Sequence, residues 1–380
     1  MDTNNFEFKF ITSIEQISQR EWNSLVHSEY PFIQYEYLQA LESSCCVNAD
    51  TGWQPNHLIV QLNGQVVALM PLYIKNHSYG EYVFDFQWAN AFHQSGLNYY
   101  PKLLSAIPFT PCAGDRLCIK SEYRQSLTSM MVEQLVKLAK KQNIESWHLL
   151  FPENDLSTVE QQSGLMQRSG MQYHWFNNNY HSFSDFLAGC KMKPRKNIKR
   201  ERRIIADSGV KLQVVEGCNI TPALWKDFFY FYQRTYAKRS GNVGYLNQKF
   251  FEIIGRTMAS KLMMVVVSLE TDVIAASLFF KSKNTLYGRY WGASAEFEFL
   301  HFEACYYQGI EYCINQGFER FDAGAQGEHK IPRGFEPIET YSYHWIADEE
   351  FRLAISDFVD REVSLVKNAI KELKRKLPFK

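Results

Sequence analysis

The sequence lacks an excess of charge of either sign, because 41 lysine and arginine residues balance 41 aspartate and glutamate residues over 380 positions. This neutrality excludes a protein that coats nucleic acid with its whole surface, but it leaves local charged patches open. Long apolar runs are also absent. The segments 262–267 and 273–280 have the length of strands, whereas a membrane-spanning helix needs roughly 20 apolar residues, so no transmembrane segment is predicted.

Two further signals are absent, a signal peptide at residues 1–10 and a metal-binding or redox motif among the cysteines. Residues 1–10 contain no basic stretch followed by an apolar one, so we expect no signal peptide and a cytoplasmic protein. The eight cysteines include no CxxC motif, and the spacing of Cys305 and Cys313 fits neither a zinc site nor a redox site. We therefore expect reduced cysteines that pack as small apolar side chains, and no metal site.

The composition itself is that of a globular protein. Apolar residues make up 46% and charged residues 22% of the chain, which is enough to bury sizeable cores. At about 150 residues per domain, the length favours two domains. The 22 tyrosines, 28 phenylalanines and 8 tryptophans indicate thick cores or an aromatic-lined groove.

Short motifs recur along the chain at a separation near 207 residues. The first copies lie at 67–68, 79–82 and 99–100, and the second copies lie at 274–275, 287–290 and 306–307. The triplet Tyr-His-Trp at 173–175 recurs at 343–345, an offset of 170 that implies a segment missing from the second half. These echoes predict a duplicated α/β unit, with domains at 1–180 and 181–380.

The hydrophobic pattern supports the duplication. Each half has a predicted hairpin, at 58–74 around Asn63-Gly64 and at 262–281 around Thr271-Asp272. Further strands are expected at 82–88 and 285–292, and helices at 97–106 and 302–316. The second half also begins with a strand at 210–215, a helix capped by Thr221-Pro222 and a helix at 248–258. Early helices, antiparallel strands and a final strand–helix–strand crossover are typical of a GNAT acyltransferase unit.

Several stretches carry a family resemblance. Residues 195–203 followed by Gly209-Val210 look like the opening of the second GNAT domain in Fem-type proteins. Six further stretches are similar to the FemAB-like family, described as peptidoglycan biosynthesis or recognition, and lie at 53–55, 70–73, 108–111, 287–291, 301–311 and 321–330. The resemblance implies an α/β (α+β) chain of two tandem GNAT folds, each a mixed, mostly antiparallel sheet flanked by helices.

The resemblance also implies a reaction. In Fem-type aminoacyltransferases an amine attacks the ester of an aminoacyl-tRNA, so the chain is expected to form an amide bond on a small-molecule or peptide amine, such as that of a peptidoglycan precursor. No tightly bound cofactor is implied. The first alternative is an N-acyltransferase that uses acyl-CoA or acyl-carrier protein, although the pyrophosphate-binding glycine signature is missing from 90–98 and 293–303. The second is a non-catalytic module that binds a peptidoglycan precursor or tRNA.

Acyl transfer to an amine needs a base, donors for the oxyanion and a way to hold both substrates in line. A glycine-rich segment that follows the predicted strand 318–322 offers such groups. The candidate catalytic residues are Asp322, Glu328, His329, Lys330 and Arg333. The Fem-type Phe-Lys-x-Gly-Phe element is altered here, so that Lys330 and Arg333 compete for the role of its lysine. Alternatively, these charges pair with one another on the surface.

Aromatic and polar residues elsewhere are candidates for substrate binding. In the second half they are His301, Glu303, Tyr306 and Tyr307 on the predicted helix, and Tyr287, Arg289 and Trp291, which alternation would place on one face of the central strand. An arginine between two aromatics suits a carboxylate or phosphate, unless it is packed in an ion pair. The first half has Trp88, His93, Tyr99, Tyr100 and Lys102 at matching places, as candidates for acceptor recognition.

The run 191–203 has eight positive residues and one negative residue in thirteen positions. Its candidate polyanion-binding residues are Lys193, Arg195, Lys196, Lys199, Arg200 and Arg203. A one-sided cationic helix suits tRNA phosphate, a nucleotide diphosphate or the anionic lipid of a peripheral membrane contact. The alternative is a solvated helix face. Because the net charge of the chain is zero, we expect an anionic partner to bind at this one basic region.

Overall fold

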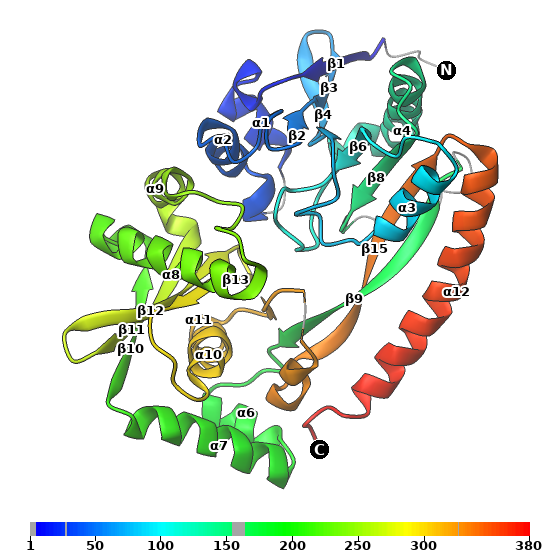
Figure 1. Cartoon of the computed structure of the whole chain (residues 1–380). Helices are drawn as coiled ribbons and strands as arrows, with labels where there is room; N and C mark the ends of the chain where they lie inside the picture. Colours follow the sequence, from blue (N-terminus) through cyan, green and yellow to red (C-terminus); the bar gives the residue numbers. More distant parts are fainter. Residues whose placement is uncertain (1–4, 27–28, 154–163, 326) are drawn as a thin grey trace. The chain divides into compact units, whose positions relative to one another are not determined.

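The computed structural model describes residues 5–26, 29–153, 164–325 and 327–380 (Figure 1). The chain forms two units, of which the first comprises residues 1–170 and 339–368 and the second comprises residues 171–338 and 369–380. These bounds differ from the ranges 1–180 and 181–380, because residues 339–368 group with the first unit. No helix among the described residues has both the length and the apolar character needed to cross a membrane.

The first unit contains two sheets, with strand orders β1-β3-β4-β7 and β15-β8-β6-β5-β2. Its strands are β1 (Glu7–Ile11), β2 (Trp53–Pro55), β3 (His57–Leu62), β4 (Gln65–Met70), β5 (Tyr73–Lys75), β6 (Lys102–Ser105), β7 (Cys118–Ile119) and β8 (Ser146–Leu150), with parts of β9 (Met166–Phe176) and β15 (Glu336–Ile346). Its helices are η1 (Ile14–Gln16), α1 (Gln19–Leu25), η2 (Pro31–Ile33), α2 (Tyr35–Ser43), α3 (Phe86–Gln94), η3 (Ser121–Tyr123), α4 (Arg124–Lys141) and most of α12 (Glu349–Lys374).

The local sequence explains the main features of this unit. The β3–β4 hairpin turns at Asn63 and Gly64, whose φ angles of 51° and 77° suit these residue types. Helix α4 buries Leu127, Met131 and Leu135 on one face, at the i, i+4, i+8 spacing of an amphipathic helix. These side chains pack in one core with residues of β3, β4, β8 and β15.

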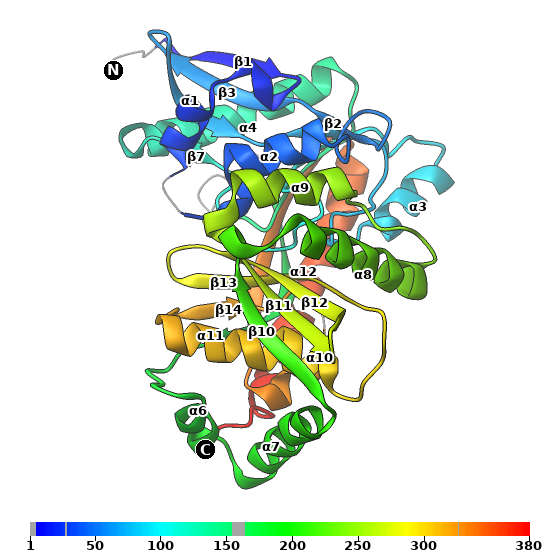
Figure 2. The same ribbon diagram turned by 90° about the vertical axis from the view of Figure 1, so that its left-hand side faces the viewer.

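The second unit has one sheet, with the order β10-β11-β12-β13-β14-β9. Its strands are β10 (Val210–Glu216), β11 (Leu262–Leu269), β12 (Asp272–Lys281), β13 (Thr285–Ala293) and β14 (Arg320–Asp322). Its helices are α6 (Phe183–Gly189), α7 (Met192–Asp207), η4 (Gly217–Asn219), α8 (Pro222–Ser240), α9 (Gln248–Thr257), η5 (Ala259–Lys261), α10 (Leu300–Phe302), the π-helical η6 (Glu303–Tyr307), α11 (Gln308–Gln316) and η7 (Glu328–Arg333). Helices α8 and α9 cover one face of the sheet, and α10–α11 cover the other (Figure 2).

The element order of the second unit agrees with the prediction. Thr221 caps α8 by accepting a hydrogen bond from the backbone of Leu224, and Pro222 occupies the first turn. The antiparallel strands β10–β13 are followed by the α10–α11 crossover to β14, which pairs in parallel with β13. The predicted fold class, mixed sheets flanked by helices in GNAT-like units, is confirmed.

The repeated Tyr-His-Trp triplet occupies equivalent places in the two units. In the second unit, His174 of β9 pairs antiparallel with Asp322 of β14. In the first unit, His344 of β15 pairs antiparallel with His148 of β8. The last strand of the first unit therefore comes from near the end of the chain, and that of the second unit comes from its middle. The exchange leaves the order of the strands along the chain unchanged, so the segment expected to be missing from the second half stays a prediction.

Two expected elements of the first half were wrong. The expected strand at 82–88 overlaps helix α3, whose Trp88 and Phe92 are buried one helical turn apart. The expected helix at 97–106 is instead the strand β6, which pairs with β5 and β8. Pro101 disfavours a helix interior there, and sheet pairing buries all four residues of β6.

Candidate functional site

Two histidines and a tyrosine meet in the second unit. The Tyr306 hydroxyl on η6 and Nε2 of His329 on η7 share a hydrogen bond of 2.9 Å. The ring of His301 on α10 lies 5.2 Å from that of Tyr306 and 6.5 Å from that of His329, measured between centroids. Helices η6 and η7 therefore bring together three of the predicted residues, at a π-helical turn of the kind that is frequent at functional sites.

Burial and the nearby cations favour the neutral form of both histidine rings. Burial, together with Arg239, His329, Lys330 and Arg333, lowers the pKa of His301 to about 3. Burial and the same three cations also lower the pKa of His329. A neutral imidazole can accept a proton, as a general base must.

Lys330 provides a cation beside these rings. Its side chain is buried, its Nζ donates to the backbone oxygen of Gly324 at 2.6 Å, and it lies 5.9 Å from the centroid of the Tyr306 ring. Gly324 has a φ of 87°, which favours glycine, and its backbone N–H donates to Oδ1 of Asp322 at 2.9 Å. The glycine-rich loop thus joins Asp322 at the end of β14 to Lys330 on η7.

Arg333, the rival of Lys330, has different surroundings. Its Nη2 donates to Oε1 of Glu201 at 2.8 Å and its Nε donates to Oε2 at 3.2 Å. Tyr307 also donates to Glu201, and the guanidinium lies 3.4 Å from the centroid of the Phe302 ring. Because this bidentate ion pair joins η7 to Glu201 on α7, Arg333 is suited to holding η7 in place.

Two acidic candidates lie outside the histidine cluster. Glu303 is buried, but Arg202 of α7 holds it through Nη2 at 3.0 Å, and Gln308 donates to it at 2.8 Å. Glu328 is exposed at the start of η7, where it adds to burial in raising the pKa of Tyr173. Arg333 therefore does not pair with Glu328 in the way that the surface alternative supposed.

Strand β13 does not pair evenly with β12. Tyr290 lies opposite Leu278 and Gly288 lies opposite Phe279, so the register shifts between these pairs. Arg289, between Gly288 and Tyr290, is the extra residue of a β-bulge. A bulge bends its strand and redirects the side chains around it.

This bulge overturns the predicted shared face of Tyr287, Arg289 and Trp291. Leu286 and Trp291 both belong to the core on the α11 side of the sheet, and the Trp291 ring lies 5.8 Å from that of His301. Tyr287, the neighbour of Leu286, therefore faces the α8 side. Strict alternation failed because it assumes uninterrupted pairing.

A second polar cluster is buried in the first unit. Nζ of Lys102 on β6 forms ion pairs with Glu81, at 2.8 Å, and with Asp85. Tyr99 donates to Oδ2 of Asp85 at 2.6 Å, and burial with the nearby carboxylates raises its pKa. Burial alone would lower the pKa of Lys102, but the two carboxylates raise it. The Tyr100 hydroxyl lies 2.8 Å from the Ser78 hydroxyl, and this hydrogen bond connects Tyr100 to the cluster.

One known protein family matches nearly the whole of this two-unit chain. Residues 13–380 match the model of the FemAB-like family, described as peptidoglycan biosynthesis/recognition. The chain belongs to this family. Among curated proteins, none matches the sequence significantly.

Solved structures resemble the FemAB-like chain in fold at low sequence identity. FemX is 12% identical, with a TM-score of 0.56 over 90% of this chain and 98% of its own. A conserved protein of unknown function from Bacteroides thetaiotaomicron is 9% identical, with a TM-score of 0.52 over 89% and 99% of the two chains. The L-PGS of Bacillus licheniformis is 9% identical, with a TM-score of 0.50 over 84% and 95%.

Of the predicted substrate-binding residues in the first unit, some lie in or beside the Lys102 cluster and one lies on the surface. Trp88 is buried, and its ring lies 4.9 Å from that of His344. His93 is exposed on α3 and makes none of the cluster's contacts. The structure thus brings together Trp88, Tyr99, Tyr100 and Lys102, but not His93.

Several members of these clusters were not among the predicted site residues. In the first unit, Tyr99 contacts Nε2 of His148 at 3.2 Å, and Nδ1 of His148 lies 2.7 Å from Nδ1 of His344. In the second unit, Nε2 of His174 lies 3.6 Å from Oδ2 of Asp322, and burial lowers the pKa of His174 to about 4. The Tyr-His-Trp repeat was the available signal, because both of its histidines lie in these buried contacts.

The polyanion candidates lie along α7. Lys193, Lys196, Lys199, Arg200 and Arg203 are exposed and Arg195 is half-buried. None of these six side chains forms an ion pair with a residue in the described ranges, and Arg200 lies 5.8 Å from the centroid of the Phe299 ring. Three or more metal-ligating side chains do not gather anywhere in the described part of the chain.

Proposed function

We propose that this FemAB-like chain is a transferase that forms an amide or peptide bond. An acceptor amine of a peptidoglycan-precursor-like molecule would attack the ester carbonyl of an aminoacyl-tRNA-type donor in the cytoplasm. The observation that carries the proposal is the cluster of neutral His329, Tyr306 and His301 beside Lys330. It combines proton acceptors and a cation in a family described as peptidoglycan biosynthesis/recognition.

Each group has a stated part in the proposed reaction. Neutral His329 accepts the proton that the amine loses as its nitrogen bonds to the carbonyl carbon. Lys330 stabilises the negative charge that develops on the carbonyl oxygen, and Tyr306 orients His329 through their hydrogen bond. The His329 imidazolium then protonates the departing ester oxygen, so the proton count balances and the enzyme is restored.

The first unit is proposed to recognise the acceptor. Oε1 of Glu81 and Oδ1 of Asp85 are buried and accept no hydrogen bond from the described part of the chain. Burial raises the pKa of Glu81 to about 7 and lowers the pKa of Lys75 to about 7. These oxygens suit the ammonium or amide donors of a peptide acceptor.

The direct test is transfer of radiolabel to a muropeptide that carries a free amine. We expect label from an aminoacyl-tRNA pool to appear on the acceptor amine. The matched arm supplies labelled acyl-CoA instead. Transfer from acyl-CoA alone would replace the proposal by the N-acyltransferase alternative, and binding without transfer from either donor would leave a recognition module.

Donor recognition has its own test on α7. Changing Lys193, Lys196 and Arg200 to Gln should weaken tRNA binding and reduce the slope of log K against log salt by about 1 for each phosphate that is no longer neutralised. Filter binding at several salt concentrations measures this slope. An unchanged slope would remove α7 from the donor site, and binding to anionic vesicles in place of tRNA would favour a peripheral membrane contact.

A further inference from the structure

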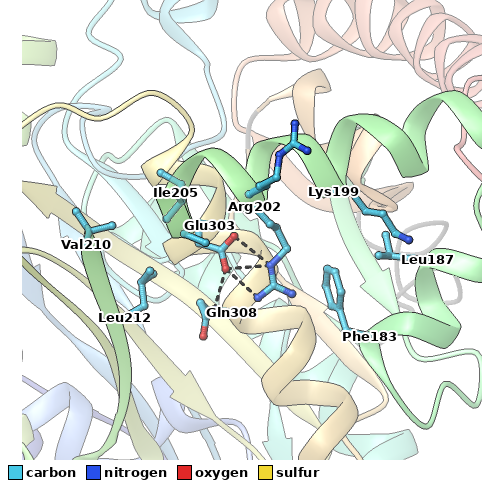
Figure 3. A pocket seen from close by; sticks show the side chains of 11 residues that line it. Phe183, Leu187, Lys199, Arg202, Ile205, Val210, Leu212, Glu303 and Gln308 are labelled. Atoms are coloured by element: carbon cyan, nitrogen blue, oxygen red, sulfur yellow. Dashed lines mark hydrogen bonds and ion pairs between the residues drawn. The ribbon is translucent and has the colours of Figure 1, made fainter. Parts of the chain in front are cut away.

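A pocket lies in the second unit beside α7, and its lining includes none of the residues of the histidine cluster. Its volume is about 650 Å³, within the range of roughly 300–1,000 Å³ that is usual for small-molecule sites. Side chains of α6, α7, β10, η6 and α11 line it (Figure 3). The pocket is therefore built from two stretches that are far apart in the sequence, residues 183–212 and 303–308.

One part of the lining is apolar. Leu187 of α6, Ile205 of α7 and Val210 of β10 are buried, and Phe183 and Leu212 are half-buried around them. Figure 3 shows Phe183 and Leu187 at one end and Val210 and Leu212 at the other. Apolar walls of this kind gain free energy when a ligand displaces water from them.

The polar floor of the pocket is an ion-pair network around Arg202. Glu303 accepts from Nε and Nη2 of Arg202, and Gln308 donates to it (Figure 3). Arg202 also donates to Glu311 at 2.8 Å, and its guanidinium covers the Phe183 ring at 4.4 Å. Since Arg202 is shared by Glu303 and Glu311, the positive charge available to an anionic ligand comes from other residues of the lining.

Two further cations line the pocket. Lys199 and Arg203 lie one helical turn apart on α7, and both are exposed. Neither side chain forms an ion pair or hydrogen bond with any residue in the described ranges. An ammonium and a guanidinium at this spacing suit one phosphate or carboxylate group.

We propose that this pocket binds an anionic amphiphile, a single apolar chain that ends in a phosphate or a carboxylate. The headgroup pairs with Lys199 and Arg203, and the chain lies against the apolar lining, where Phe183 and Leu212 are the half-buried side chains. Nucleic acid is the weaker match, because a phosphate backbone requires the cationic face but leaves an apolar pocket unfilled. The inference does not depend on the proposed transferase reaction.

The test titrates the full chain with hexyl, octyl and decyl phosphate below their micellar concentrations, by calorimetry. Each buried CH₂ should tighten binding about fourfold, the equivalent of roughly 0.8 kcal/mol, until the pocket is filled. Inorganic phosphate should bind far more weakly than decyl phosphate, and decanol should also bind more weakly. Affinity that ignores chain length would overturn the proposal.

Matched variants of one helix locate the site. Lys199→Gln with Arg203→Gln should weaken decyl phosphate binding at least tenfold, whereas Lys193→Gln with Lys196→Gln removes the same charge outside the pocket and should have little effect. Ala206→Trp places a large side chain at an exposed lining position, and it should abolish the chain-length dependence. Equal losses in the two double variants would mean a general charge effect and would sink the pocket site.

A second arm distinguishes the source of the amphiphile. Sedimentation with phosphatidylglycerol vesicles that Ala206→Trp abolishes would support a bilayer lipid, and decyl phosphate binding without sedimentation would support a free amphiphile. Sedimentation that Ala206→Trp leaves intact and Lys193→Gln with Lys196→Gln reduces would contradict the pocket. Displacement of decyl phosphate by tRNA, with equal sensitivity to both double variants, would assign the surface to RNA instead.

Discussion

At the scale of single residues, Lys330 and Arg333 lie on the same short helix, but substitutions at the two positions should have different effects. Lys330→Met removes the cation beside Tyr306 and should lower kcat by roughly 100- to 1,000-fold, as the loss of one oxyanion donor does, with little change in stability. Arg333→Met leaves Glu201 buried without its partner and should cost about 3 kcal/mol of unfolding free energy. Transfer assays and urea denaturation separate the two effects.

The control for Arg333 is a second change at its partner. Glu201→Gln combined with Arg333→Met removes both charges and should recover much of the lost stability, because no unpaired buried charge remains. If Arg333→Met alone lowers kcat while stability is unchanged, the assignment of Lys330 as the oxyanion donor is wrong.

The pKa of His329 gives a second prediction at this scale. Burial, Lys330, Arg333 and Arg239 lower that pKa, so the base form persists to lower pH than for an ordinary histidine. Arg239→Gln removes one cation and should shift the acidic limb of the kcat/KM profile to higher pH. Arg234→Gln, an exposed arginine of the same helix, is the control and should leave the limb in place. A shift to lower pH would exclude His329 as the base.

At the scale of elements, β13 and α8 approach each other at Gly292. A Cβ added there would lie 2.2 Å from the backbone carbonyl carbon and oxygen of Phe231, and backbone cannot yield as a flexible side chain can. Gly292→Ala should therefore cost about 2 kcal/mol or more of stability, measured by thermal or urea unfolding. Gly288→Ala is the milder comparison, because its Cβ would meet the Phe321 ring at 3.2 Å. Equal stability of the two variants would contradict this packing.

The elements that could be predicted are those with local signals. The β3–β4 turn follows from Asn63-Gly64, and the start of α8 follows from Thr221-Pro222, because cap and turn residues act within a few positions. Strand β6 and the bulge at Arg289 could not be predicted in this way, because pairing with distant strands decides them. The histidine cluster could be predicted in part. His301, Tyr306, His329 and Lys330 were named, whereas Glu201, the partner of Arg333, was counted only as a lone acid in a basic run.

At the scale of the whole molecule, each unit has a buried histidine contact on the strand that it takes from the other half of the sequence. His344 of β15 contacts His148 in the first unit, and His174 of β9 contacts Asp322 in the second. All three rings are buried, and burial lowers their pKa values, to about 3 for His148 and about 4 for His174. The sequence repeat therefore marks strands that complete each unit and also carry its buried histidines.

These histidines predict a loss of stability in acid. A histidine whose pKa is lower in the folded chain than its ordinary value near 6.5 contributes fully above pH 6.5, and the contribution falls by about 1.4 kcal/mol per pH unit below it. Glu81, whose pKa burial raises to about 7, opposes this trend between its ordinary pKa and pH 7. Urea unfolding of wild type and of His148→Gln with His344→Gln, compared from pH 4.5 to 7, isolates the histidine part as the difference in slope. Parallel slopes, or imidazolium signals for these rings in NMR spectra at pH 5, would show that the buried pair is charged in the folded protein.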